Sequence, residues 1–112
     1  MGKMQACRED VIIFGASRLG EIALNILSDK YNILYFSDND KSKWGKKFCS
    51  IEVISPEELT RYVNKKLIIA SMYYGEISNQ LKDLGFNNIY VFSYVDSNDT
   101  TYKKRYTIDK IC

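Results

Sequence analysis

The sequence contains no histidine, and this absence excludes several kinds of site at once. Histidine is the commonest general base near neutral pH, the usual partner of a nucleophilic serine or cysteine, and a frequent ligand of catalytic zinc. Any chemistry would therefore depend on carboxylates, lysine, tyrosine, cysteine or a bound cofactor. We expect no metal site.

Long apolar runs and a strong charge of one sign are missing as well. The longest uninterrupted apolar run, residues 11–14, is far too short to cross a bilayer, and the charged residues 8–10 argue against a signal peptide. The net charge of +2 is too small to indicate nucleic acid or an anionic membrane as a partner. We therefore expect neither a nucleic-acid partner nor a membrane association.

Cysteine is scarce and follows no pairing pattern. Cys7, Cys49 and Cys112 are widely spaced and form no Cys-x-x-Cys motif, so the sequence indicates neither a disulfide framework nor a zinc site. This use of cysteine is typical of a reducing compartment. We expect a cytoplasmic protein.

The order of the apolar segments predicts an α/β fold. Runs of strand length alternate with segments of helical spacing, and Ser55, Pro56 and Glu58 form a typical helix start. That helix is expected to end at residues 65–66, and Gly85 is expected to end the helix before the last strand. The expected strands are residues 11–14, 32–37, one or two short strands in 48–54, 67–71 and 89–92.

This alternation favours a Rossmann-like, doubly wound parallel sheet of about five strands in the order 3-2-1-4-5. The 112 residues, 46% of them hydrophobic and 27% charged, correspond to one ordinary globular domain over residues 1–112. Its core is expected in residues 11–92. Residues 93–112 are expected to form a polar tail or a short closing helix.

The first expected strand ends in the motif Gly15-x-Ser17-x-x-Gly20, which resembles the Gly-x-Gly-x-x-Gly phosphate loop of dinucleotide-binding folds. In that loop the first glycine makes the tight turn and the third allows close packing of helix and strand. Serine replaces the middle glycine here, and its hydroxyl could donate to a phosphate. Arg18 could add a charged contact, and the helix start behind the loop would offer N–H groups and the positive end of a dipole.

The second expected strand ends in Asp38, Asn39 and Asp40, at the distance expected of a ribose-binding acid. Asp38 could accept both ribose hydroxyls, and its charge would repel a 2′-phosphate, which favours NAD-like or UDP-like ligands over NADP. In a doubly wound sheet this acid, the glycine loop and the end of the fourth strand share one crevice. The candidate nucleotide-binding residues are Gly15, Ala16, Ser17, Arg18, Leu19, Gly20, Asp38, Asn39, Ser71, Met72 and Tyr73.

Less specific readings of these features remain open. Glycine occurs at strand-to-helix turns of many α/β proteins, and Tyr73 with Tyr74 could serve packing alone. The basic residues 41–47 around Trp44 are expected to form a solvated loop, with the indole folded onto the core, rather than a phosphate clamp. Tyr62 and Lys66 match the Tyr-x-x-x-Lys spacing of short-chain dehydrogenases, but they precede the fourth strand, so we interpret the match as coincidence.

Residues 14–20, 36–46 and 51–59 together resemble one recurrent bacterial module. It is similar to the Rossmann-like domain that precedes the catalytic part of bacillosamine-type sugar-nucleotide acetyltransferases, and to that of nucleoside-diphosphate-sugar epimerases and dehydratases in polysaccharide synthesis. The resemblance implies a nucleotide, nucleotide-sugar or CoA ligand. It places Gly15, Ser17, Arg18 and Gly20 on the phosphates, and Asp38 with Asn39 on the ribose or base.

The sequence therefore predicts a module that binds NAD or a UDP-type nucleotide in sugar-nucleotide metabolism and works with a catalytic partner domain or subunit. One alternative is a small NAD-dependent epimerase or oxidoreductase that uses Tyr73, Tyr74 or a lysine as its acid or base. Another alternative is a structural module that forms a homodimer or docks on another protein without binding a ligand. A methyltransferase is disfavoured, because that fold needs strands beyond the five expected here.

Overall fold

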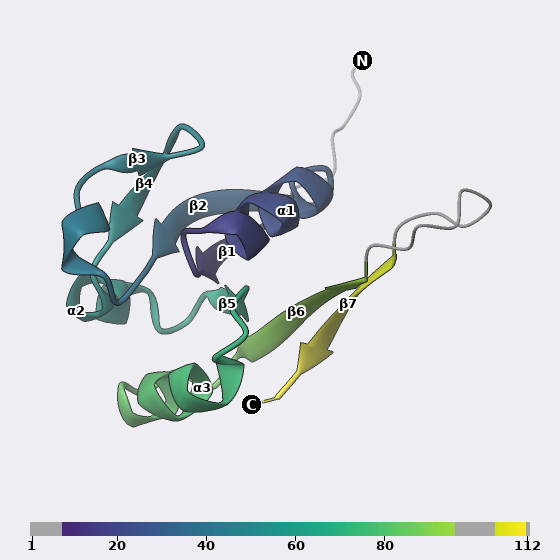
Figure 1. The fold of residues 1–112 in the computed structure, drawn as a ribbon. Helices are drawn as coiled ribbons and strands as arrows, with labels where there is room; N and C mark the ends of the chain where they lie inside the picture. Colours follow the sequence, from purple (N-terminus) through teal and green to yellow (C-terminus); the bar gives the residue numbers. More distant parts are fainter. Residues whose placement is uncertain (1–7, 96–104, 112) are drawn as a thin grey trace, which may run out of the picture.

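The computed structural model describes residues 8–95 and 105–111 (Figure 1). A seven-stranded sheet has the order β3-β4-β2-β1-β5-β6-β7. Its inner strands β4, β2, β1, β5 and β6 are parallel, whereas β3 and β7 run antiparallel to their neighbours at the two edges. The elements in chain order are β1 (Glu9–Phe14), α1 (Arg18–Leu27), β2 (Tyr31–Ser37), the 3-10 turn η1 (Lys41–Lys43), β3 (Lys47–Phe48), β4 (Ile51–Ile54), α2 (Pro56–Leu59), the 3-10 turn η2 (Thr60–Tyr62), β5 (Lys66–Ile69), α3 (Tyr74–Asp83), β6 (Ile89–Val95) and β7 (Arg105–Lys110).

The mostly parallel, Rossmann-like core agrees with the prediction, but the strand count and the full strand order do not. We expected about five strands in the order 3-2-1-4-5. The structure adds an antiparallel strand at each edge, so seven strands are present in the described residues. At one edge β3 and β4 form a hairpin whose turn residues Cys49 and Ser50 both have positive φ, at 52° and 68°.

At the other edge, the described part of residues 93–112, namely 93–95 and 105–111, forms strand where a polar tail or a closing helix was expected, and the rest of that range lies outside the described residues. Strand β6 continues to Val95, and β7 pairs with it from Val95↔Arg105 to Tyr90↔Lys110. The alternation in β7 gives the physical reason, because Tyr106 and Ile108 pack against the core while Thr107 and Asp109 are exposed. A period of two is the pattern of an edge strand with one buried face.

Strands β1 and β5 are buried on both faces over most of their length, which is why their sequences contain continuous apolar runs. In β1, Ile12 and Phe14 face one core cluster while Val11 and Ile13 face the other, and all four are at most 2% exposed. Helix α1 covers the second cluster, and α2 and α3 cover the first, on the opposite face of the sheet (Figure 1). This arrangement places the carboxyl ends of β1, β2 and β5 beside the starts of α1 and α3.

The helix ends follow the predicted chemistry, with one difference in length. The Ser55 hydroxyl accepts the N–H of Glu58 at 3.1 Å, and Pro56 occupies the first turn of α2, as the sequence predicts. The helix ends at Leu59, not at residues 65–66, and a 3-10 turn follows it. Gly85 directly follows Leu84, the C-cap residue of α3, and has φ +102°.

Within the described residues, no helix is long and apolar enough to cross a membrane.

Candidate functional site

The turn after β1 is tight, and it needs glycine at positions 15 and 20 because a Cβ at either one would clash with a backbone carbonyl oxygen. Gly15 has φ +124°, and a Cβ on it would lie 2.3 Å from the carbonyl oxygen of Ala70 in the neighbouring segment after β5. A Cβ on Gly20, in the first turn of α1, would lie 1.9 Å from the carbonyl oxygen of Gly15. These are the roles expected of the first and third glycines of a phosphate loop.

Ser17 is the N-cap residue of α1, and its backbone oxygen accepts the N–H of Glu21 at 2.9 Å. Its side chain is exposed and makes no capping hydrogen bond, so the hydroxyl is available at the start of the helix. The Arg18 side chain is 83% exposed and lies 3.9 Å from the Glu21 carboxylate. Leu19 is half-buried and packs against the core cluster on the α1 face.

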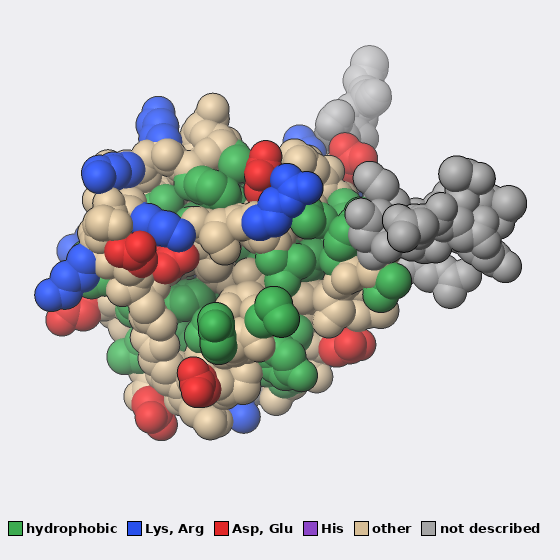
Figure 2. All heavy atoms as spheres, viewed as in Figure 1, with side chains coloured by type: hydrophobic (Ala, Val, Ile, Leu, Met, Phe, Trp, Pro, Cys, Tyr) green, Lys and Arg blue, Asp and Glu red, His purple; other side chains and the backbone are tan. Residues whose placement is uncertain are grey.

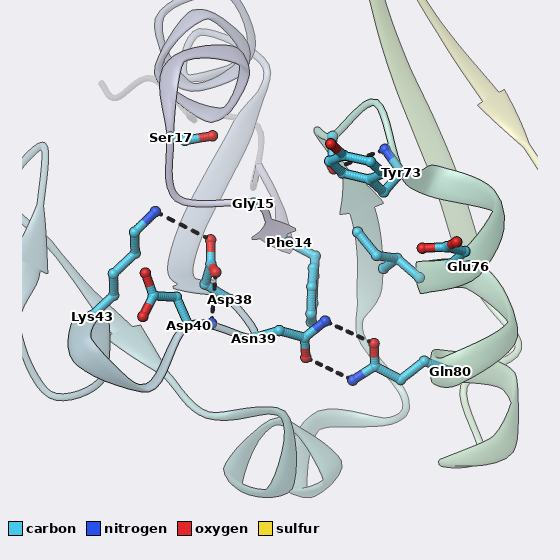
Figure 3. Close-up of a pocket in the computed structure, with 12 residues that line it drawn as sticks. Phe14, Gly15, Ser17, Asp38, Asn39, Asp40, Lys43, Tyr73, Glu76 and Gln80 are labelled. Carbon is cyan, nitrogen blue, oxygen red and sulfur yellow. Dashed lines mark hydrogen bonds and ion pairs between the residues drawn. The ribbon is translucent and has the colours of Figure 1, made fainter.

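Asp38 ties the end of β2 to the glycine loop (Figure 3). One carboxylate oxygen accepts the N–H of Ala16 at 2.8 Å, and the other accepts the N–H of Asp40 at 2.9 Å. The Lys43 ammonium lies 3.7 Å from the first oxygen and donates to the carbonyl of Ala16 at 2.8 Å. Because an ionised carboxylate has about four acceptor positions, Asp38 retains capacity for ligand hydroxyls.

A crevice of about 550 Å³ opens between the ends of β1, β2 and β5 and the first turns of α3 (Figure 3). Six of the candidate residues line it: Gly15, Ser17, Asp38, Asn39, Ser71 and Tyr73. Phe14, Asp40, Lys43, Glu76, Ile77 and Gln80 also line it and were not among the candidates. The sequence puts Asp40 in the acidic cluster after the second strand and Lys43 in the expected solvated loop, and the three residues on α3 carry no motif, so the topology brings them here.

The remaining candidates lie elsewhere around the loop. Arg18, Leu19 and Met72 line a second hollow of about 600 Å³, which shares Ser17, Ser71 and Tyr73 with the crevice and extends toward Phe92 and Tyr94. Ala16 is buried and contributes its backbone to the Asp38 contact, and Gly20 lies behind the loop in α1. Tyr73 lines both hollows and is 72% exposed, while Met72 is 86% exposed.

Side chains of the loop after β2 form more hydrogen bonds with the neighbouring backbone than the sequence predicts. As predicted, Trp44 folds onto the core, where its indole N–H donates to the carbonyl of Asp38 at 2.7 Å. Lys43 departs from the expectation of a solvated loop, since it is anchored on the glycine loop. Hydrogen bonds from the Ser42 hydroxyl and then from the Ser42 N–H lower the pKa of the Asp40 carboxyl, which caps η1.

Asn39 and Gln80 join the two walls of the crevice through paired amide hydrogen bonds of 3.0 and 2.8 Å (Figure 3). In a double-mutant cycle of Asn39→Ala and Gln80→Ala, we expect a coupling free energy of about 0.5–1 kcal/mol. The value is small because each exposed amide can form hydrogen bonds with water once its partner is removed. Chemical denaturation of the four proteins measures it. Additive effects would show that the pair does not hold β2 and α3 together.

Two further sequence features have no part in this site. Tyr62 lies 3.4 Å from the hydroxyl of Tyr35, whereas Lys66 pairs with Glu9 at 3.2 Å, so the Tyr-x-x-x-Lys spacing brings together no acid and base. Across residues 8–95 and 105–111, no group of three or more cysteine, aspartate and glutamate side chains could hold a metal ion.

The fold and the loop define a Rossmann-like α/β domain. A family model described as C2185-like, N-terminal, matches residues 7–92, and the chain belongs to this family. A search of curated proteins gives no match.

Solved structures with the same fold include nucleotide-binding proteins. UDP-D-quinovosamine 4-dehydrogenase from Vibrio fischeri superposes with a TM-score of 0.66 and 18% identity over 95% of each chain. RSP, a Rex-family repressor, superposes with a TM-score of 0.62 and 21% identity over 82% of this chain. The chain spans about half, 48%, of that repressor. RSP has been solved with β-NADH and with β-NAD⁺ and operator DNA, at TM-scores of 0.60 and 0.58.

These structural similarities confirm the Rossmann-like fold that the sequence resemblance implies. The acetyltransferase relationship, the role in polysaccharide synthesis and the bacterial, cytoplasmic setting stay predictions. The absence of a nucleic-acid partner also stays a prediction, because one of the similar structures contains operator DNA.

Proposed function

We propose that the chain is a nucleotide-binding module that holds NAD or a UDP-type nucleotide at the carboxyl ends of β1 and β2. The observation that carries this proposal is the contact of Asp38 with the Ala16 N–H at 2.8 Å, which brings a ribose-binding type of acid onto the glycine loop. The start of α1 lies directly behind that loop. Its N–H groups and dipole favour the diphosphate of such a ligand.

The crevice and the second hollow suit the two parts of an extended ligand. Asp38 and Asn39 would meet the ribose or base in the crevice, and the Ser17 hydroxyl, which lines both spaces, would meet the phosphates between them. The second hollow is walled by Leu19, Met72 and Tyr74, whose apolar surfaces would accept a further ring or sugar. We include the role in sugar-nucleotide metabolism in this proposal, with a catalytic partner domain or subunit.

A small NAD-dependent epimerase or oxidoreductase is the second candidate, favoured by Tyr73, an exposed residue with an acidic hydroxyl that lines both hollows. Turnover of a UDP-sugar in the presence of NAD, abolished by Tyr73→Phe, would support it. Binding without turnover would support the module.

The test of the proposed function is a titration of the ¹⁵N-labelled protein with NAD, UDP, a UDP-sugar and CoA. We expect one of these ligands to shift the amide signals of Gly15, Ser17 and Asn39 at sub-millimolar concentration, because their N–H groups lie at or beside the crevice. Signals at the amino ends of β1 and β5, at the opposite edge of the sheet from the loop, serve as the internal control. Unchanged spectra with all four ligands at millimolar concentration would overturn the proposal.

A further inference from the structure

A third hollow, of about 370 Å³, lies beside the glycine loop on the face of the sheet that carries α1, and we call it the lysine pocket. Phe48 and Val53, which belong to the core cluster of that face, form its apolar wall. Ala16 and Ser17 of the loop form another wall, and the segment between β2 and β3 supplies the rest: Ser42, Lys43, Lys46 and Lys47. Figure 2 shows basic side chains gathered around β3 and the segment before it, at the upper left.

The backbone that carries these lysines is held in place. Gly45, with φ +77°, donates its N–H to the carbonyl of Val53 at 2.8 Å, and the Val53 N–H donates to the carbonyl of Lys46 at 2.8 Å. Lys43 is fixed at the other end by its bond to the Ala16 carbonyl. Because both ends are anchored, the three lysines are presented from a defined loop and not from a flexible one.

The charged residues that line the pocket are all basic. Three of its eight lining residues are lysines, and none of the eight is acidic. Lys43 is compensated by Asp38 at 3.7 Å, whereas neither Lys46 nor Lys47 forms an ion pair within 4.0 Å in the described part of the chain. At longer range, the charge of Lys46 makes a small contribution to the lowered pKa of the Asp40 carboxyl. Like charges gathered in a concave site raise the local concentration of anions. The Ser17 hydroxyl, which makes no capping bond, adds a neutral donor at the same place.

We propose that the lysine pocket is a binding site for a phosphate group. A phosphate offers three strong acceptor oxygens, which match the ammonium groups of Lys46 and Lys47. The pocket shares Ser17 and Lys43 with the crevice, so a phosphate on the 2′ or 3′ position of a ribose held at Asp38 would enter it. That source rests on the proposed function. A separate phosphate ion is the other source.

The proposal reverses one expectation drawn from the sequence. Asp38 alone predicts the exclusion of a 2′-phosphate through charge repulsion. In the structure its charge is offset by Lys43 and is turned toward the Ala16 and Asp40 N–H groups. With Lys46 and Lys47 beyond it, the site favours the additional phosphate.

The test compares two variants that lose the same charge. The double variant of Lys46→Gln and Lys47→Gln removes the two lysine charges of the pocket that form no ion pair in the described residues, and both side chains are exposed, so we expect the fold to be preserved. The matched control combines Lys41→Gln and Lys82→Gln, two exposed lysines outside the pocket. Inorganic phosphate, NAD with NADP, and dephospho-CoA with CoA are titrated into native protein and both variants, with amide shifts as the readout.

We expect inorganic phosphate to shift the Ser17, Ser42 and Lys47 signals, and the pocket variant to weaken its binding about tenfold, because two charged contacts to the phosphate are lost. The control variant should bind as native protein does. If the phosphate comes from a ribose, NADP or CoA will bind more tightly than its partner lacking the phosphate, and only the pocket variant will lose this preference. If NAD and NADP bind equally while inorganic phosphate still needs Lys46 and Lys47, the pocket takes a separate ion.

The proposal is overturned if neither phosphorylated ligand is preferred and inorganic phosphate does not bind or is weakened equally in both variants. Failure of the proposed function gives a different result. In that case no nucleotide shifts the crevice signals of Asn39 and Gly15, while inorganic phosphate still binds through the lysines.

Discussion

Replacing Gly20 with alanine is expected to lower the free energy of unfolding by about 3 kcal/mol, at the upper end of the range for overpacked sites. The new methyl group would lie 1.9 Å from the carbonyl oxygen of Gly15 and 3.2 Å from the ring of Phe36. The glycine loop cannot move away from it, because Gly15 donates to Ser37 at 2.8 Å and already lies against the Ala70 carbonyl. Either the loop or the first turn of α1 must distort.

Gly75→Ala is the matched control for this prediction. Gly75 also lies in the first turn of a helix, α3, but a Cβ on it would meet nothing within 4 Å. There the change should stabilise the protein by up to about 1 kcal/mol, since alanine is the better helix former. Chemical denaturation of both variants measures the difference. A Gly20→Ala protein as stable as native would show that the loop and α1 are not packed as closely as the structure indicates.

The segment from β1 to the start of α1, with Gly15 and Gly20, is the part of the fold that the local sequence predicts best. Strand β1, the turn and the start of α1 form one continuous pattern of apolar residues, glycine spacing and helical periodicity, and such patterns depend on neighbours in the chain. The burial of β1 and β5 on both faces was predictable for the same reason, since each is a short apolar run. The parallel, Rossmann-like core follows from the alternation of these elements.

The edge strands were predicted incompletely because their signals are short or divided. Strand β3 has only two residues, and its pairing depends on Cys49 and Ser50 adopting positive φ without a glycine. In β7 the alternation of Tyr106 and Ile108 with Thr107 and Asp109 was present, but it followed a long polar stretch and was assigned to a tail or helix. Pairing with β6 is a tertiary event that composition does not indicate.

In the candidate site, too, residues that belong to a local motif were predictable and residues placed by tertiary packing were not. The glycine loop, Asp38 and Asn39 were predictable because a known motif places them at strand ends. Lys43, Glu76 and Gln80 were not, because their contribution depends on how η1 and α3 lie relative to the loop. The sequence also did not predict that the Asp38 carboxylate points toward Ala16. This contact means that Asp38 holds the glycine loop in place, in addition to its proposed contact with a ligand.

Replacing Asp38 with alanine is expected to lower the free energy of unfolding by about 2–3 kcal/mol, because the Ala16 and Asp40 N–H groups lose a charged acceptor. The same change removes the partner of Lys43. Asp38→Asn keeps one acceptor oxygen for the two N–H groups, so its loss of stability should be intermediate. Asp29→Ala, at an exposed position after α1, is the control for loss of one negative charge and should leave stability nearly unchanged.

Ligand binding separates the structural task of Asp38 from the proposed one. If its carboxylate contacts a ribose, Asp38→Ala will weaken NAD or UDP by about 1–3 kcal/mol, the cost of leaving the sugar hydroxyls without an acceptor, and will weaken inorganic pyrophosphate much less. If Asp38 only holds the glycine loop in shape, both kinds of ligand will weaken by the same factor, because both depend on the N–H groups at the start of α1. Isothermal titration calorimetry of native protein and the Asp38→Ala and Asp29→Ala variants with each ligand decides between the two, and equal losses would refute the ribose contact.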